Sequence, residues 1–267
     1  MAYWITRFGS TDLSQISLRQ QDPLEAALGL VNLPGGGVHD SWGSAQAPAK
    51  LPSRITCDSE YVEATSGAFR TALYAVRALI GTRAILYRSP DGEAANSESV
   101  LARLESVRMG RNADNILVMG VGLTFEALAA VWDGAAHTET ITLDASPKSQ
   151  DCDNGGNGIV RAVTITVTAS GSPITAVTIE NLETGHITKI KYAGSIAVGQ
   201  SLVIDCGAMT IRNNGVNAYT STAFTLEAGH SLREWLRLMP GANTIRVTRT
   251  GGDNASTCVL TYNDGWM

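Results

Sequence analysis

The sequence predicts a mainly β protein, a β-rich α+β chain of two domains, and three observations carry this prediction. From residue 159 to residue 262, β-branched residues alternate with polar ones and the runs break at Gly, Asn, Asp and Ser clusters. That pattern is typical of antiparallel strands with one buried face. Most of the 27 glycines lie between apolar runs, as the many turns of a β protein require. Helical periodicity is clear in one stretch, residues 67–80.

A Pro-Gly turn marks the clearest pair of strands. Pro240 presets φ for the first turn position, and Gly241 or Asn243 can take the position with positive φ that such turns often need. Ile245 and Val247 follow with the spacing of one strand face. We therefore expect one strand to end before this turn and another to begin after it.

The first half of the chain predicts one helix among several strands. We expect strands over residues 3–8, 53–64, 83–88, 100–109 and 115–125. Four apolar residues recur at three- and four-residue spacing: Phe69, Leu73, Val76 and Ile80. They predict an amphipathic helix over residues 67–80, with Gly81 as its C-terminal cap. Residues 33–52 read as a long loop, and loops of that length tend to be functional or to reach a neighbour.

The second half of the chain predicts a β-sandwich or jelly roll. Residues 146–158 are rich in Asp, Asn and Gly, and we place the domain boundary there, between residues 1–145 and 146–267. Short strands are then expected at 160–168, 177–181, 187–192, 201–206, 209–211, 223–226, 235–238, 245–250 and 256–262.

Composition and charge limit the classes of protein that fit. The net charge of −5 disfavours a basic surface for binding nucleic acid. We find no apolar run long enough to cross a bilayer and no signal peptide, so we expect a soluble chain that interacts with no membrane and is assembled in a reducing cytoplasm. The four cysteines lie far apart without a Cys-x-x-Cys pair, which disfavours a thiolate metal site, and Cys206 and Cys258 are expected to be core residues.

The only metal-like cluster is the run from Asp151 to Gly158. It starts like a calcium loop, but it lacks the closing Glu of an EF-hand, and a structural turn is the favoured alternative. The four histidines are isolated and without ligand spacing, so we expect them at the surface or in turns. We therefore expect no metal and no cofactor.

Catalytic residues are not apparent. A glycan hydrolase could use acid pairs such as Asp151 with Asp153 or Glu180 with Glu183, but paired acids are common in solvated loops. Trp235 and Trp42 could stack on sugar rings, although Trp235 fits a core position better. We expect a protein that is not an enzyme.

In two regions the sequence resembles the distal tail proteins of long-tailed bacteriophages. The first region is the order of residues 78–88, 102–107, 123–126 and 131–133, which is similar to the ring-forming N-terminal domain of that family. The second is the order of residues 154–158, 179–185, 202–206 and 238–245, which is similar to the family's galectin-like C-terminal β-sandwich. A galectin's set of sugar-contacting residues cannot be traced, so sugar binding does not follow from this resemblance.

The resemblance implies a structural virion protein at the distal end of a phage tail. Such a protein forms a ring of identical subunits, commonly six, that joins the tail tube to the tail-tip or baseplate hub. The implied partners are further copies of the chain, the tail tube protein, the hub protein and the tape measure protein. DNA would pass through the lumen without specific binding, which the mild negative charge suits.

Three residues are candidates for the assembly interface. Trp42 lies on the long loop, and bulky aromatic residues often anchor subunit contacts. Arg70 and Arg77 lie off the apolar stripe of the helix, on the face that a neighbour could contact. The alternative function that stays open is a carbohydrate-binding module with which the virion contacts its host.

Overall fold

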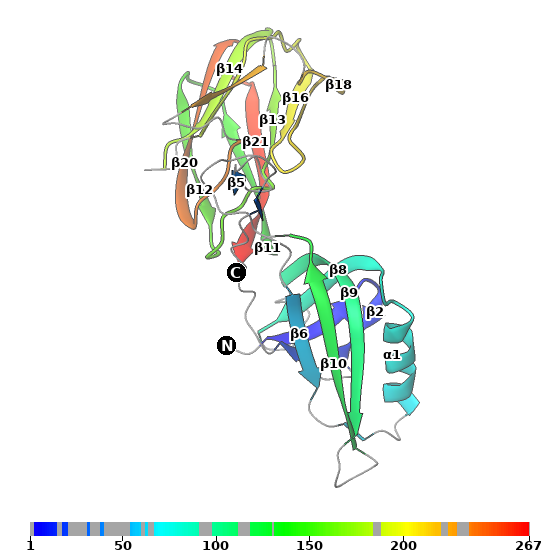
Figure 1. The fold of residues 1–267 in the computed structure, drawn as a ribbon. Helices are drawn as coiled ribbons and strands as arrows, with labels where there is room; N and C mark the ends of the chain where they lie inside the picture. Colours follow the sequence, from blue (N-terminus) through cyan, green and yellow to red (C-terminus); the bar gives the residue numbers. More distant parts are fainter. Residues whose placement is uncertain are drawn as a thin grey trace. The chain divides into compact units, whose positions relative to one another are not determined.

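The computed structural model describes residues 3–14, 18–20, 31–32, 38–39, 54–59, 62–63, 67–90, 98–111, 118–129, 131–183, 188–219, 224–228 and 235–266. The chain forms two compact units, Met1–Gly134 and Ala135–Trp266 (Figure 1), and passes from the first to the second within β11 (Trp132–Thr142). Trp42 lies outside the described residues. The division into a ring-forming domain of residues 1–145 and a sandwich domain of residues 146–267 remains a prediction.

The first unit is a closed antiparallel barrel. Around the barrel, the strands follow the order β1 (Trp4–Phe8), β3 (Leu18–Gln20), β6 (Arg54–Ser59), β10 (Val118–Ala127), β9 (Glu98–Arg111) and β8 (Arg83–Ser89). The pairing of β8 with β1 closes the circle. Two short strands, β2 (Thr11–Asp12) and β7 (Val62–Glu63), extend β1 and β10. Closure gives each barrel strand a partner on both sides, which removes the free edges of an open sheet.

Alternating apolar residues fill the barrel. Phe8 and Phe125 are buried, and their ring centroids lie 5.2 Å apart. Ile5 also points inward, although it lies three residues from Phe8, because a bulge between Ile5 and Arg7 shifts the register of β1 against β8. The predicted strands at 3–8 and 83–88 are confirmed.

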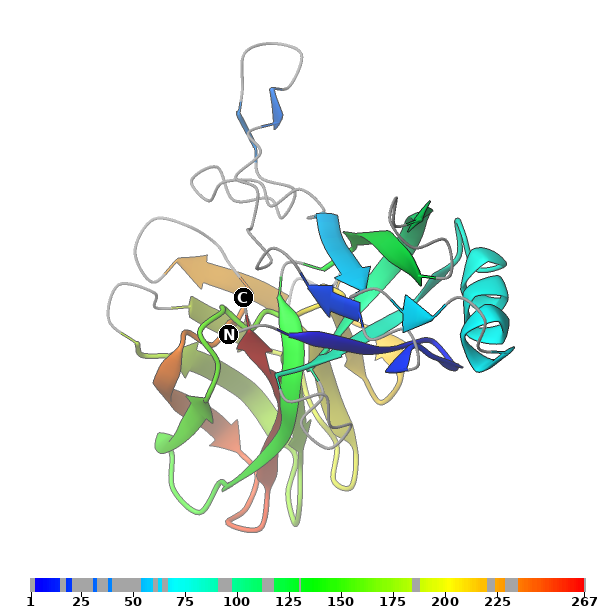
Figure 2. The same ribbon diagram turned by 90° about the horizontal axis from the view of Figure 1, so that it is seen from below.

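The helix α1 (Gly67–Arg77) lies beside the barrel, with β2 among its contacts (Figures 1 and 2). Leu73 and Val76 are buried, and Tyr74 is exposed on the opposite side. The helix ends earlier than residue 80, so the prediction that Ile80 belongs to the buried stripe is wrong; its side chain is 47% exposed. Gly81 has φ +85°, and this conformation allows the chain to reverse into β8. The N–H of Gly81 donates a hydrogen bond to the carbonyl of Leu104.

The second unit is a β-sandwich. One sheet has the order β18 (Val216–Asn217), β17 (Thr210–Asn213), β16 (Ser201–Asp205), β13 (Thr164–Thr168), β21 (Thr257–Trp266) and β11. The other has the order β12 (Lys148–Asn154), β20 (Gly241–Gly251), β14 (Ile174–Asn181), β15 (Thr188–Tyr192) and β19 (Phe224–Ala228). Apolar residues from both sheets form one core, including Ile165, Leu260, Ile179 and Val247. The mainly β fold with one helix is therefore confirmed.

Two local predictions in the sandwich are wrong. Residues 148–154 form strand β12, although their polar composition predicted a boundary turn, because β12 is an edge strand with an exposed outer face. Residues 235–238, predicted as a strand, form only a single bridge between Leu238 and Val160. Cys206 and Cys258 are buried core residues, as predicted.

Candidate functional site

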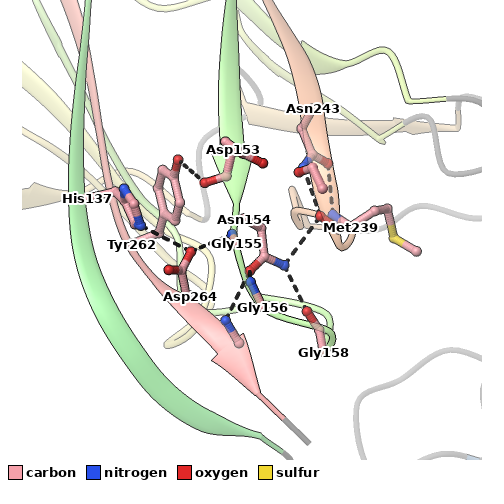
Figure 3. Close-up of polar contacts among 12 residues, drawn as sticks. His137, Asp153, Asn154, Gly155, Gly156, Gly158, Met239, Asn243, Tyr262 and Asp264 are labelled. Carbon is pink, nitrogen blue, oxygen red and sulfur yellow. Dashed lines mark hydrogen bonds and ion pairs between the residues drawn. The ribbon is translucent and has the colours of Figure 1, made fainter. Parts of the chain in front are cut away.

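The run that looked most like a site, Asp151–Gly158, is held by one buried side chain, that of Asn154 (Figure 3). Its Oδ1 accepts hydrogen bonds from the N–H groups of Gly156 at 3.2 Å and Gly265 at 3.0 Å. Its Nδ2 donates to the carbonyls of Gly158 at 2.8 Å and Met239 at 3.3 Å. Two accepted and two donated bonds use the full capacity of a carboxamide. Asn154 thus ties the end of β12 to β21 and to the turn before β20.

Asn243 plays the same part on the neighbouring strand. Its Oδ1 accepts from the N–H of Met239 at 2.8 Å and from Nδ2 of Asn181 at 3.0 Å. Its Nδ2 donates to the carbonyls of Met239 at 2.8 Å and Gly241 at 2.9 Å. Of the two residues expected to supply positive φ in this turn, Gly241 does so, with φ +86°. Asn243 closes the turn through its side chain instead.

Glycine is required at one position of this cluster. A Cβ atom on Gly156 would lie 1.9 Å from the carbonyl oxygen of Gly265, far inside contact distance. The N–H of the preceding residue, Gly155, donates to Oδ1 of Asp264 at 2.7 Å. Gly156 therefore lets the chain pass close to the C-terminal strand, which no bulkier residue at that position would allow.

A histidine, a tyrosine and an aspartate lie beside the cluster (Figure 3). Nε2 of His137 lies 3.0 Å from Oδ1 of Asp264, and the His137 ring stacks on Tyr262 with centroids 5.1 Å apart. The Tyr262 hydroxyl donates to the carbonyl of Asp153 at 2.8 Å. Burial, and then the nearby Cys152 and Glu139, raise the pKa of Tyr262. His137, expected at the surface or in a turn, lies in strand β11 with 30% of its side chain exposed, and its partners come from a strand more than a hundred residues later.

This cluster holds strands together, and two of its side-chain oxygens that could bind a cation already accept hydrogen bonds within the protein. Oδ1 of Asn154 could bind a cation only by releasing two N–H groups, and Oδ1 of Asp151 accepts from the Thr244 hydroxyl at 2.9 Å. Within the described ranges, no group of three or more His, Cys, Asp or Glu residues could hold a metal ion. Residues 151–154 are strand and not the predicted turn.

Glu180, one of the acids weighed as hydrolase residues, also has structural partners. Glu180 is 8% exposed, and its Oε2 lies 2.9 Å from Nε of Arg246. Its Oε1 lies 3.7 Å from Nζ of Lys189 on the other neighbouring strand. The hydrogen bond to Glu180 raises the pKa of Arg246. Glu180 therefore neutralises two cations across three strands, an arrangement that holds the sheet.

Of the three interface candidates, only Arg77 has a side chain among the described residues. Trp42 lies outside them, and so does the side chain of Arg70, whose backbone is part of α1. Arg77 lies in the last turn of α1 and is exposed. In the part of the chain that the structure describes, no helix is long and apolar enough to span a bilayer.

An exposed apolar pair on the barrel was not foreseen. Ile85 on β8 and Leu101 on β9 are register partners, and their side chains are 38% and 43% exposed. The neighbouring register pair is Arg83 with Arg103, and Arg103 forms an ion pair with Glu126. The outer barrel surface thus presents an apolar pair beside cations. Its signal in the sequence was a break in the alternation, because Ile85 lies between Ala84 and Leu86, and Leu101 lies between Val100 and Ala102.

The comparisons with known proteins agree with this architecture. Residues 157–266 match the family described as "Siphovirus-type tail component, C-terminal domain". A crystal structure of the Dit protein of phage SPP1 is similar over 97% of this chain and 98% of that chain, with TM-score 0.62 and 16% identity. Its description calls that protein a paradigm of the hub adsorption apparatus in phages that infect Gram-positive bacteria.

Weaker likenesses are found in a baseplate. A chain of the phage P2 baseplate in its activated conformation with Ca aligns over 98% of this chain and 96% of that chain, with TM-score 0.36 and 10% identity. A chain of the same baseplate with Sr aligns with TM-score 0.35 and 11% identity, over 98% of this chain and 97% of that chain. No curated protein sequence matches this chain.

Proposed function

Residues 157–266 match the siphovirus-type tail component family, and the whole chain has a fold similar to that of a phage Dit protein. From these two likenesses we propose that the protein is the subunit of a distal tail ring. In this proposal, copies of the chain, six in number, form a closed ring that joins the tail tube to the tail-tip or baseplate hub. The tube protein, the hub protein and the tape measure protein are its partners. The role is structural and needs no catalysis.

The observation that carries the proposed ring is the apolar pair on the closed barrel. Ile85 and Leu101 face outward, although the barrel has its own filled interior and needs no further cover. Exposed apolar side chains that gather on one face of a folded unit are a mark of protein–protein contact. A ring requires one patch to meet a different patch on the next copy. We assign the Ile85–Leu101 pair to one side of that contact.

The exposed side of α1 is our candidate for the other side. Tyr74 is 68% exposed and Arg77 lies one turn further along. Tyr and Arg are the residue types that most often dominate binding energy at interfaces. Arg70, in the same helix, and Trp42, on the predicted loop, remain proposed contacts on the sequence argument.

We further propose that residues 1–145 form the ring and that the sandwich within 146–267 faces other tail proteins. DNA then passes through the ring without binding, and the net charge of −5 supports this because an excess of acids repels phosphates. The expected result is that the assembled protein retains no duplex DNA in a filter-binding assay at low salt. Retention that disappears at high salt would contradict a non-binding lumen.

Surface substitutions test the assignment of the ring contact. Leu101→Asp should dissociate the ring, because it replaces an apolar contact with a carboxylate that must lose its water at the interface. Val198→Asp is the matched control, since Val198 is 50% exposed but belongs to the sandwich. Both variants should unfold at the temperature of the wild type. Sedimentation velocity should then show smaller species for Leu101→Asp alone. Equal assembly of both variants would remove the barrel pair from the interface.

A further inference from the structure

An aromatic stack that includes Trp235 lies at the surface of the sandwich, apart from the Asn154 cluster and the barrel pair. The ring of Tyr219 is 50% exposed and lies nearly parallel to that of Trp235, with an interplanar angle of 9° and centroids 6.1 Å apart. Phe224 tilts against both rings, at 5.7 Å from Tyr219 and 5.4 Å from Trp235. Phe224 and Trp235 pack on the sandwich core. The exposed ring of Tyr219 is therefore backed by fixed aromatic surface.

The backbone also holds Tyr219 in place. Its N–H donates to Oδ1 of Asn217 at 3.0 Å, in the turn that follows β18. Met209, at the start of the same β17–β18 hairpin, has φ +56° and a side chain that is 37% exposed. A non-glycine residue with positive φ is uncommon, and such backbone strain tends to occur at functional sites.

Tyr219 and residues of the β17–β18 hairpin line a groove of about 510 Å³. Its lining side chains and backbone come from Met209, Thr210, Arg212, Gly215, Asn217 and Tyr219. The volume lies in the range of small-molecule sites. Among the side chains that line it, Met209 and Tyr219 supply apolar surface, whereas Thr210, Arg212 and Asn217 are polar. Of the described residues that line the groove, one is a cation and none is a carboxylate.

We propose that this groove binds one or two rings of a saccharide. A sugar ring has a face of C–H groups that can stack on an aromatic ring, and hydroxyl groups at its edge that need hydrogen-bond partners. Tyr219 supplies the stacking surface. The guanidinium of Arg212 supplies up to five donors, and the Thr210 hydroxyl can both donate and accept. Asn217 keeps its Nδ2 for a ligand, since its Oδ1 is committed to Tyr219.

Other ligand classes fit this groove less well. A nucleic acid strand would need several cations along its path, and among the described lining residues Arg212 is the one cation. A divalent cation would need carboxylate or carbonyl oxygens, and the lining residues that the structure describes include no acid. An apolar helix would need a longer apolar groove than Met209 and Tyr219 provide. The saccharide site would give the tail tip a weak contact with a host surface, whether or not the ring forms.

The test is saturation-transfer NMR and tryptophan fluorescence with the full chain. The probes are maltose, lactose, chitobiose and glucuronic acid, which vary the hydroxyl pattern and the charge. At least one probe should receive saturation and should change the emission of Trp235, a change that Trp235→Phe removes. Tyr219→Ala should weaken this binding about tenfold or more, the equivalent of about 1.4 kcal/mol. Arg212→Ala should weaken it, and Tyr219→Phe should retain it.

Tyr74→Ala is the matched control, because Tyr74 is an exposed tyrosine on α1 in the other unit. It should leave binding unchanged. The thermal unfolding of Tyr219→Ala must match that of the wild type, and Tyr219→Phe provides a milder comparison if it does not. Absence of transfer to every probe, or equal transfer with Tyr219→Ala, would overturn the proposal. If Tyr219→Ala abolished binding of a tail protein partner but left saccharide binding unchanged, the saccharide proposal would be overturned. The groove would then be a docking site for a protein.

Discussion

Arg88 and Glu98 form a buried ion pair at one end of the barrel. Nε and Nη2 of Arg88 each lie 2.6 Å from Oε2 of Glu98, and the side chains are 1% and 11% exposed. The Arg88 guanidinium lies between two aromatic rings, 3.9 Å from the centroid of Tyr3 and 4.2 Å from that of Trp132. Burial lowers the pKa of Arg88, although Glu98 favours its charged form. The pair joins β8 and β9 to the N-terminal segment and the start of β11.

Removing one member of this ion pair should lower the free energy of unfolding more than removing both members does. Glu98→Gln should lower the free energy of unfolding by about 3–5 kcal/mol, because it leaves the Arg88 charge buried without its partner. The double variant Arg88→Met with Glu98→Leu should be closer to the wild type. Urea unfolding followed by far-UV circular dichroism measures both. A double variant as unstable as Glu98→Gln would show that the aromatic contacts, and not the unpaired charge, determine the cost.

Asn154→Ala should destabilise the sandwich by about 3 kcal/mol or more, since it leaves several buried backbone groups without partners at about 1–3 kcal/mol each. Asn154→Asp should be at least as harmful, because its oxygens would face the carbonyls of Gly158 and Met239. Gln150→Ala is the control, an exposed amide on the same strand. Thermal unfolding measured by calorimetry compares the three. A neutral Asn154→Ala would contradict the role given to the cluster.

The two neighbouring glycines should differ in their tolerance of a side chain. Gly156→Ala places a methyl group 1.9 Å from a backbone oxygen, so either β12 or β21 must move. Gly155→Ala places it 3.2 Å from the Asp264 carboxylate, which can shift slightly. Gly156→Ala should therefore lower the melting temperature much more than Gly155→Ala does. Similar melting temperatures would mean that the contact with Gly265 relaxes easily.

Stability should fall in alkaline solution because of the cysteines. Burial raises the pKa of Cys206 and Cys258 from 9.0 to about 12. The unfolded chain thus loses these protons first, so the stabilisation is complete below pH 9 and is lost as the pH rises through about 12. Urea unfolding under reducing conditions should show this decline. Cys258→Ala should make the decline shallower, and an unchanged slope would mean that Cys258 titrates normally.

The sequence predicted the strands whose two faces differ in polarity. In β13 and β16 apolar and polar residues alternate, and both strands lie within their predicted ranges. The alternation failed for β12, since an edge strand can be polar along nearly its whole length. Barrel closure could not be read from local pattern at all, because it depends on β9 pairing with both β8 and β10.

The site was less predictable than the fold for the same reason. Asn154 and its partner Gly265 are separated by 111 residues. The contact between His137 and Asp264 is also long-range in the sequence. The local sequence shows only an Asn-Gly-Gly run, which suits a turn equally well. Resemblance to a family supplied the order of the domains, but it carried no information about which surfaces, such as the Ile85–Leu101 pair, are exposed in this chain.

The most direct test of the proposed function is the mass and shape of the purified full chain. Native mass spectrometry should give about six times the chain mass of 28.2 kDa, and negative-stain images of the same sample should show a ring with a central hole. Mixing with the tail tube and hub proteins should retain that ring at their junction. A protein that stays monomeric across concentrations, and also in the presence of both partners, would contradict the distal tail ring.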